Sequence, residues 1–278
     1  MPTLDLDDAT VHYEVRGSGP PLVFLHGGWL DRDLWKPQVE RFAEAHTVVT
    51  PDLRGHGESL ADDSFDIDRM AADVAALCEQ LDAGRPTLVG LSLGSLVAQR
   101  FGAAHPDWLA GLVLAGTVRS VPPIPGPEAG RRLLAPRGPA HAWVRLWGPA
   151  ATFRTLLGSV ETAEGTWLAL DDAARSYALN CIDAYDSGAF LRVLDTFHEF
   201  RPLDLSELDV PTLLIHGDHE ASAVVAQNRR LARTIPDADH VVIEDAGHLL
   251  NRDAPEKFDA ALSQFLDERV RIADVAAD

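Results

Sequence analysis

Seven short apolar runs alternate with amphipathic stretches along this 278-residue chain, and this alternation limits the possible folds more than any other feature. We interpret these runs as strands, most of them buried on both faces. They are VHYEV (11–15), LVFLHG (22–27), TVVTPD (47–52), TLVGLS (87–92), GLVLAGT (111–117), PTLLIHG (211–217) and HVVIED (240–245). Apolar residues at helical spacing predict helices near residues 70–81 and 258–266. We therefore predict an α/β fold with a mostly parallel sheet and helices on both faces.

The alternation stops between residues 118 and 205, where VPPIPGPEAG opens a segment rich in proline, arginine and tryptophan with no convincing strand. We interpret 118–205 as an inserted helical cap, and 1–117 with 206–278 as the domain that carries the sheet. Trp143 and Trp147 lie in this segment, and we predict that they line a substrate pocket beneath the cap. Packing within the cap is the alternative explanation for both side chains.

Composition and charge exclude several classes of protein. Hydrophobic residues make up 46% of the chain and charged residues 24%, which is typical of a globular protein, and no apolar run approaches the roughly 18 residues of a membrane span. The 43 acidic residues against 24 Lys and Arg give a formal charge of −19, which repels nucleic acid phosphates and anionic membrane surfaces. We expect neither as a partner, and the oligomeric state stays open.

The N-terminal stretch MPTLDLDDATVHYEV lacks the basic start, the apolar stretch and the cleavage site of a secretory signal, so the expected location is cytoplasmic. Cys78 and Cys181 are far apart in the sequence and indicate neither a disulfide framework nor a cysteine metal site. We expect both to be thiols in the core.

The stretch TLVGLSLGSLVAQ, residues 87–99, places Ser92 where a buried strand meets a helix. Gly90 and Gly94 flank it in the spacing GxSxG, a turn that holds its serine in a strained conformation and requires neighbours almost without side chains. The hydroxyl is left exposed at the helix N-terminus, where the helix dipole favours developing negative charge. We therefore predict that Ser92 is a nucleophile; a serine that only caps a helix is the alternative.

A second motif, LVFLHGGWLDRDLW at residues 22–35, follows an early strand. HGG can aim backbone N–H groups at the position where an acyl oxygen becomes negative, and we predict the N–H groups of Gly28 and Leu93 as the oxyanion donors. We expect His26 to shape this loop through hydrogen bonds rather than to act as a base. Trp29 is expected to line the substrate pocket.

Two later loops supply an acid and a base. EDAGHLLN places His248 after the last strand, and IHGDHEAS places Asp218 and Glu220 after the strand before it. The chain order serine, acid, histidine is the order that goes with the GxSxG turn. Asp218, His219 and Glu220 could also be metal ligands, because carboxylate and imidazole are ordinary ligands. The residues alone leave the role of each acid open.

The motifs HGGW, PDLRGHGES, GLSLGS, LLIHGDHE and AGHLLN, in this order, resemble those of the α/β-hydrolase superfamily over nearly the whole chain outside the cap. The resemblance implies an eight-stranded sheet and a serine hydrolase that uses neither a cofactor nor a metal. Ser92 would attack an ester or lactone carbonyl, and His248 would take its proton and later activate water. In this family the acid stands three residues after the glycine that ends its strand, which implies Glu220 in place of the usual Asp.

Within the superfamily the chain looks most like the 3-oxoadipate enol-lactonase group and related carboxylesterases, which implies a small-molecule ester or lactone as substrate. A hydrolase of carbon–carbon bonds in ring-fission products is one alternative, although the longer Gly-rich loop of that group is absent. A ligand-binding protein on a hydrolase scaffold is another. Arg131, Arg132, Arg137, Arg145 and Arg154 of the cap could hold an anionic lactone, but we expect them to be solvated and predict a neutral, fairly apolar substrate.

Overall fold

The computed structural model describes residues 1–61, 65–121 and 137–270. Its eight main strands are β1 (Thr3–Leu6), β2 (Ala9–Arg16), β3 (Pro21–Leu25), β4 (Thr47–Pro51), β6 (Thr87–Leu91), β7 (Gly111–Ala115), β8 (Thr212–Gly217) and β9 (Ala238–Ile243). They form one sheet in the order β1-β2-β4-β3-β6-β7-β8-β9, and the two-residue strand β5 (Leu60–Ala61) pairs with β2 as a ninth. From β4 to β9 along this path all neighbours are parallel, which confirms the mostly parallel sheet.

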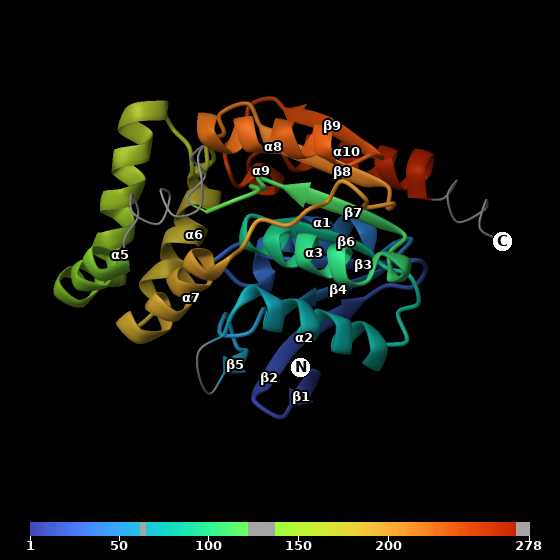
Figure 1. Cartoon of the computed structure of the whole chain (residues 1–278), viewed down its shortest axis with the longest axis horizontal. Helices are drawn as coiled ribbons and strands as arrows, with labels where there is room; N and C mark the ends of the chain where they lie inside the picture. Colours follow the sequence, from blue (N-terminus) through green and yellow to red (C-terminus); the bar gives the residue numbers. More distant parts are fainter. Residues whose placement is uncertain (62–64, 122–136, 271–278) are drawn as a thin grey trace.

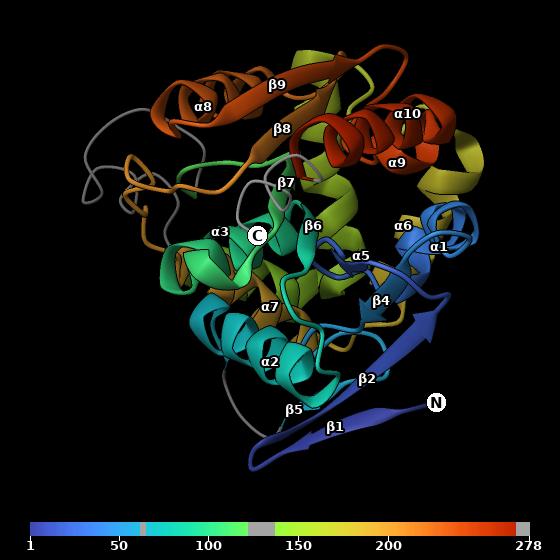
Figure 2. The ribbon, with the colours of Figure 1, turned by 90° about the vertical axis from the view of Figure 1, so that its right-hand side faces the viewer.

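Helices cover both faces of the sheet, as the sequence predicts (Figure 2). One face carries α2 (Ile67–Gln80), α3 (Leu93–Ala104) and α8 (Ser222–Thr234). The other carries α1 (Lys36–Phe42), α9 (Leu250–Asp253) and α10 (Pro255–Phe265). The domain that carries the sheet also contains three short helices: η1 (Arg32–Trp35), η2 (Pro106–Trp108) and η3 (Leu266–Val270).

The apolar runs of the central strands β3, β4, β6, β7 and β8 are continuous because each of these strands buries both of its faces. Leu88 and Val89 are neighbours on β6 and both are fully buried, but Leu88 belongs to the apolar cluster that contains Phe101 of α3, whereas Val89 belongs to the cluster that contains Phe258 of α10. A strand with alternating polar residues could not satisfy two such layers. The central strands are therefore a rigid support for the loops at their carboxyl ends.

A buried ion pair holds the turn after β4 against α2. The Arg54 guanidinium donates to both carboxylate oxygens of Asp73 at 2.8 and 2.6 Å, and it pairs with Asp8 at 2.8 Å. Burial raises the pKa of Asp73, although the hydrogen bonds from Arg54 oppose this. Because Arg54 and Asp73 are both buried, neither charge has water as a replacement partner.

Three helices connect β7 to β8 and stand together at the left of Figure 1: α5 (Arg137–Glu164), α6 (Asp172–Asp183) and α7 (Ser187–Glu199). They lie within the range predicted for the cap and share a small apolar cluster that includes Val144, Ile182 and Phe190. Within the described residues, no helix is both long and apolar enough to cross a membrane.

Candidate active site

Ser92 stands between the end of β6 and the first residue of α3. Its backbone has φ 54° and ψ −114°, a conformation that residues with side chains rarely adopt. A Cβ on Gly90 would lie 2.3 Å from the carbonyl oxygen of Gly94, and a Cβ on Gly94 would lie 2.1 Å from that of Leu25. Gly90 is required because β6 and α3 approach closely at this turn, and Gly94 is required because α3 begins against the end of β3.

The loop that carries HGGW packs directly against this turn. Nε2 of His26 accepts a hydrogen bond from the N–H of Leu53 at 2.9 Å, and its Nδ1 lies 2.8 Å from the carbonyl oxygen of Gly27, so this buried histidine shapes the loop. A Cβ on Gly28 would lie 3.7 Å from the Cβ of Leu93. Neither Gly28 nor Leu93 has a hydrogen-bond partner for its backbone N–H in the part of the chain that the structure describes.

Glu220 and His248 meet beyond the carboxyl ends of the neighbouring strands β8 and β9. Nδ1 of His248 lies 2.7 Å from Oε2 of Glu220, and both side chains are buried. Asp218 is exposed, and its carboxylate accepts the N–H of Ala246 at 3.1 Å, which fixes the turn. Of the two acids in IHGDHEAS, the structure brings Glu220 to the histidine.

Glu220 and His248 each favour the charged form of the other side chain. Burial raises the pKa of Glu220, but the charge of His248 and hydrogen bonds from His248, Trp167 and the N–H of Ala221 lower it more, so the net pKa is below its usual value. Burial lowers the pKa of His248, but the charge of Glu220 and the hydrogen bond to it outweigh this effect and leave the pKa raised. Among the described residues, no group of three or more His, Cys, Asp or Glu side chains is arranged to hold a metal ion.

Ser92 and His248 line one small cavity of about 70 Å³, together with Gly28 and Trp29. The remaining walls are almost entirely apolar and come from the strand ends and the cap helices: Gly27, Leu30, Leu91, Phe153, Trp167, Leu168, Ala178, Ile182, Phe197 and Leu249. Apart from His248, no charged or titratable side chain lines this catalytic cavity among the described residues.

A family model of alpha/beta hydrolases matches residues 22–261 of the chain. The chain belongs to the alpha/beta hydrolase family. It is 25% identical to (E)-2-((N-methylformamido)methylene)succinate hydrolase of Acinetobacter baylyi over 274 residues, which cover 95% of this chain and 97% of the relative. This hydrolase also resembles solved structures, among them a thermophilic esterase from Thermogutta terrifontis at a TM-score of 0.82 and 28% identity, covering 96% of this chain and 99% of the esterase.

The enol-lactonase from Burkholderia xenovorans LB400 is a further structural neighbour of the hydrolase, with a TM-score of 0.79 and 25% identity over 96% of this chain and 100% of the enol-lactonase. This similarity supports the sequence-based assignment near the enol-lactonase group. The family and its neighbours therefore show that the chain is a hydrolase.

The prediction that Trp143 and Trp147 line the substrate pocket of the hydrolase is wrong. Their exposed fractions are 49% and 70%, and neither side chain lines the catalytic cavity. The two residues are four positions apart on α5 and share an outward face, whereas α5 buries the face of Val144. Phe153 from α5 and Phe197 from α7 take the place expected for the two tryptophans.

Five arginines of the cap were considered as ligands for an anionic substrate of the hydrolase. Those that the structure describes do not reach the catalytic cavity. Arg131 and Arg132 lie outside the described residues. Arg137, Arg145 and Arg154 are all exposed, and none of them lines the cavity.

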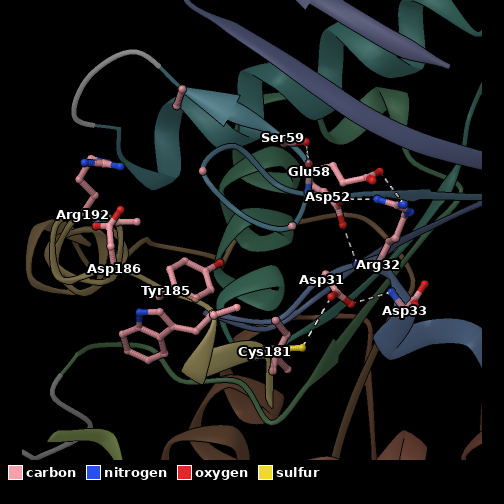
Figure 3. Close-up of a pocket in the computed structure, with 17 residues that line it drawn as sticks. Asp31, Arg32, Asp33, Asp52, Glu58, Ser59, Cys181, Tyr185, Asp186 and Arg192 are labelled. Atoms are coloured by element: carbon pink, nitrogen blue, oxygen red, sulfur yellow. Dashed lines mark hydrogen bonds and ion pairs between the residues drawn. The ribbon is translucent and has the colours of Figure 1, made fainter. Parts of the chain in front are cut away.

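A larger cavity of about 530 Å³ adjoins the catalytic cavity of the hydrolase, and Trp29 and Leu30 belong to the walls of both. Figure 3 shows the side chains that line this larger cavity. This outer cavity lies between the turn after β4 and the junction of α6 and α7. Its charged lining residues are Asp31, Asp33, Asp52, Glu58 and Asp186 against Arg32 and Arg192. Carboxylates therefore outnumber guanidinium groups around the outer cavity.

Cys181 is half-buried: it packs against the apolar core, where the sequence places it, and it also lines the outer cavity. Its thiol lies 3.6 Å from a carboxylate oxygen of Asp31, and burial together with that charge raises its pKa to about 12. The thiol is therefore protonated near neutral pH and is a poor nucleophile. Cys78 is buried in the core as expected.

Sequence reasoning missed the contact of Trp167 with the acid of the hydrolase. The indole Nε1 donates a hydrogen bond to Oε1 of Glu220 at 2.5 Å, across 53 positions of the sequence. No local pattern marks this tryptophan among the aromatic residues of the cap, because the contact exists only after the segment between α5 and α6 has folded onto the strand ends.

Proposed function

We propose that this hydrolase cleaves a carboxylic ester or lactone through an acyl-enzyme, with Ser92, His248 and Glu220 as its catalytic triad. The observation that carries the proposal is the buried 2.7 Å hydrogen bond between Glu220 and His248, where His248 lines one cavity with a serine held in a strained turn. A carboxylate at Nδ1 selects the imidazole tautomer whose Nε2 can accept a proton. The esterase and enol-lactonase among the structural neighbours support the same class of reaction.

In the proposed reaction Oγ of Ser92 attacks the carbonyl carbon while Nε2 of His248 takes the hydroxyl proton. The N–H groups of Gly28 and Leu93 donate to the resulting oxyanion. The carbon–oxygen bond to the leaving group then breaks, and His248 returns the proton to that oxygen. Water, activated by His248, attacks the acyl-enzyme in the same manner, releases the acid and restores Ser92. Glu220 stabilises the imidazolium in both halves.

The proposed substrate is neutral and has a small, apolar reacting end. A cavity of about 70 Å³ with apolar walls offers no counter-ion to a carboxylate near the reacting carbonyl. The part of a substrate that does not fit there would extend past Trp29 into the outer cavity, where the excess of carboxylates disfavours an anion. Turnover of anionic 3-oxoadipate enol-lactone at least a hundredfold faster than of neutral lactones and aryl esters would overturn this choice of substrate.

A fluorophosphonate probe tests the proposed chemistry. We expect stoichiometric labelling of the parent protein at Ser92, no labelling of Ser92→Ala, and hydrolysis of p-nitrophenyl acetate by the parent alone. A folded parent that is neither labelled nor active on any ester or lactone would support a ligand-binding protein instead. A labelled parent that cleaves ring-fission diketones faster than esters would be a carbon–carbon bond hydrolase.

A further inference from the structure

Trp167 contacts both the acid and the base of the proposed triad. Besides the indole hydrogen bond to Glu220, its backbone carbonyl accepts the N–H of His248 at 2.7 Å. The centres of the indole and imidazole rings are 5.0 Å apart, with an angle of 34° between the ring planes. One residue of the cap segment thus holds the acid by its side chain and the histidine by its backbone.

The hydrogen bonds of Glu220 explain why a glutamate needs such a partner. Oε2 faces Nδ1 of His248, while Oε1 accepts from the indole of Trp167 and from the N–H of Ala221 at 2.9 Å. A glutamate has one more rotatable bond than the aspartate usual at this position, so its carboxylate can swing away from the histidine unless the second oxygen is fixed. The Trp167 indole and the Ala221 N–H fix that oxygen from two directions.

The segment that carries Trp167 is itself tied to the histidine loop. The carboxylate of Asp253 accepts the N–H of Leu170 at 3.0 Å through one oxygen and that of Gly247 at 2.8 Å through the other. The N–H of Trp167 donates to Oε1 of Glu161 at 3.2 Å. The Asp253 bonds and the bond from the N–H of His248 to Trp167 dock the linker between α5 and α6 (residues 165–171) on the loop that precedes α9, whereas the Glu161 bond ties the linker to α5.

We propose that Trp167 is a positioning residue for the catalytic acid, and that the triad is complete only while the linker 165–171 is docked. The proposal rests on the proposed serine hydrolase function. If the linker moved away, Glu220 would lose its indole donor, and a buried carboxylate with fewer donors would no longer be held on Nδ1 of His248. The cap would then control the catalytic machinery as well as the shape of the cavity.

Kinetics of Trp167→Phe test the proposal, because phenylalanine keeps an aromatic ring against His248 but loses the N–H donor together with the second ring of the indole. A hydrogen bond to a charged group corresponds to about a tenfold effect on rate, so we expect kcat to fall about tenfold on p-nitrophenyl acetate with KM little changed. Trp143→Phe, the same exchange at an exposed site, should leave both constants at the parent values.

A double-mutant cycle with Glu220→Asp separates the positioning of Glu220 by Trp167 from a general loss of activity in the Trp167→Phe protein. We expect the shorter aspartate to keep its hydrogen bond to His248 and to lose the one from Trp167, so removal of the indole N–H should have almost no further effect on kcat in the Glu220→Asp protein. Equal losses in the two backgrounds would mean that Trp167 acts by another route and would overturn the proposal.

An NMR readout makes the test independent of activity. The indole N–H proton of Trp167, identified by its loss in Trp167→Phe, should resonate far downfield and move upfield in Glu220→Gln. A resonance unchanged by Glu220→Gln would overturn the proposal, as would Trp167→Phe with parental kcat in folded protein. If the parent hydrolyses no ester and Ser92 resists the fluorophosphonate, the proposed function fails, and the positioning role fails with it even where the indole resonance responds as expected.

Discussion

Replacement of Phe153 by alanine should lengthen the acyl chain that the hydrolase accepts. The catalytic cavity of about 70 Å³ has room for roughly two water-sized groups, so the parent should prefer acetyl over longer esters. Phe153 is half-buried and forms part of the apolar wall contributed by the cap, so its truncation opens this wall without removing a group of the triad. Each methylene that then becomes buried contributes about 0.8 kcal/mol.

Room for two further methylenes corresponds to about 1.6 kcal/mol, which is a gain of roughly fifteenfold in kcat/KM for butyryl relative to acetyl esters. The assay is a series of p-nitrophenyl esters from acetyl to decanoyl with the parent, Phe153→Ala and Trp147→Ala. Trp147 is 70% exposed, so its variant should keep the parental profile. The reasoning is refuted if the folded Phe153→Ala protein keeps the parental preference, or if the parent already cleaves decanoyl as fast as acetyl esters.

Three other outcomes follow from the described contacts. Protonated His248 cannot take a proton, so kcat/KM should rise with pH as His248 loses its proton. The midpoint should lie above 6.5 because Glu220 raises the pKa of His248, and it should move to lower pH in Glu220→Gln. The pH dependence of kcat/KM, measured for both proteins, checks these expectations. Asp73→Asn leaves the buried charge of Arg54 without its main partner and should lower the free energy of unfolding in urea by about 3 kcal/mol, whereas Asp8→Asn, at a side chain that is 44% exposed, should change it little. EDTA should leave the rate unchanged, and a loss that zinc restores would revive the metal interpretation of IHGDHEAS.

The sheet could be predicted from the sequence because burial on both faces leaves a continuous apolar signal in each central strand. All seven apolar runs form strands, and the fold class is confirmed. The predicted helices near residues 70–81 and 258–266 correspond to α2 and α10. The two-residue strand β5 gave no such signal, because it is too short to show a periodicity.

Ser92 and His248 of the proposed triad could be named from the sequence because each follows a strand in a recognisable pattern, whereas Glu220 could be preferred to Asp218 only through the resemblance to the α/β-hydrolase superfamily. The residues that surround the triad could not be predicted in this way. Trp143 and Trp147 are indistinguishable by pattern from Phe153 and Trp167, since the cap has little periodicity of its own and the face that each helix buries depends on its docking to the core. Contacts between segments so distant in the chain become visible only in the structure.

The central claim is that Glu220, and not Asp218, is the acid of the triad. The most direct measurement compares kcat of Glu220→Gln and Asp218→Asn in folded protein on one p-nitrophenyl ester. Glutamine keeps the shape of the side chain but leaves His248 in the wrong tautomer, so we predict a loss of up to about 10⁴ in kcat. Asp218→Asn should lose only a small part of its rate, because the exposed Asp218 carboxylate only fixes a turn. A larger loss for Asp218→Asn than for Glu220→Gln would contradict the assignment.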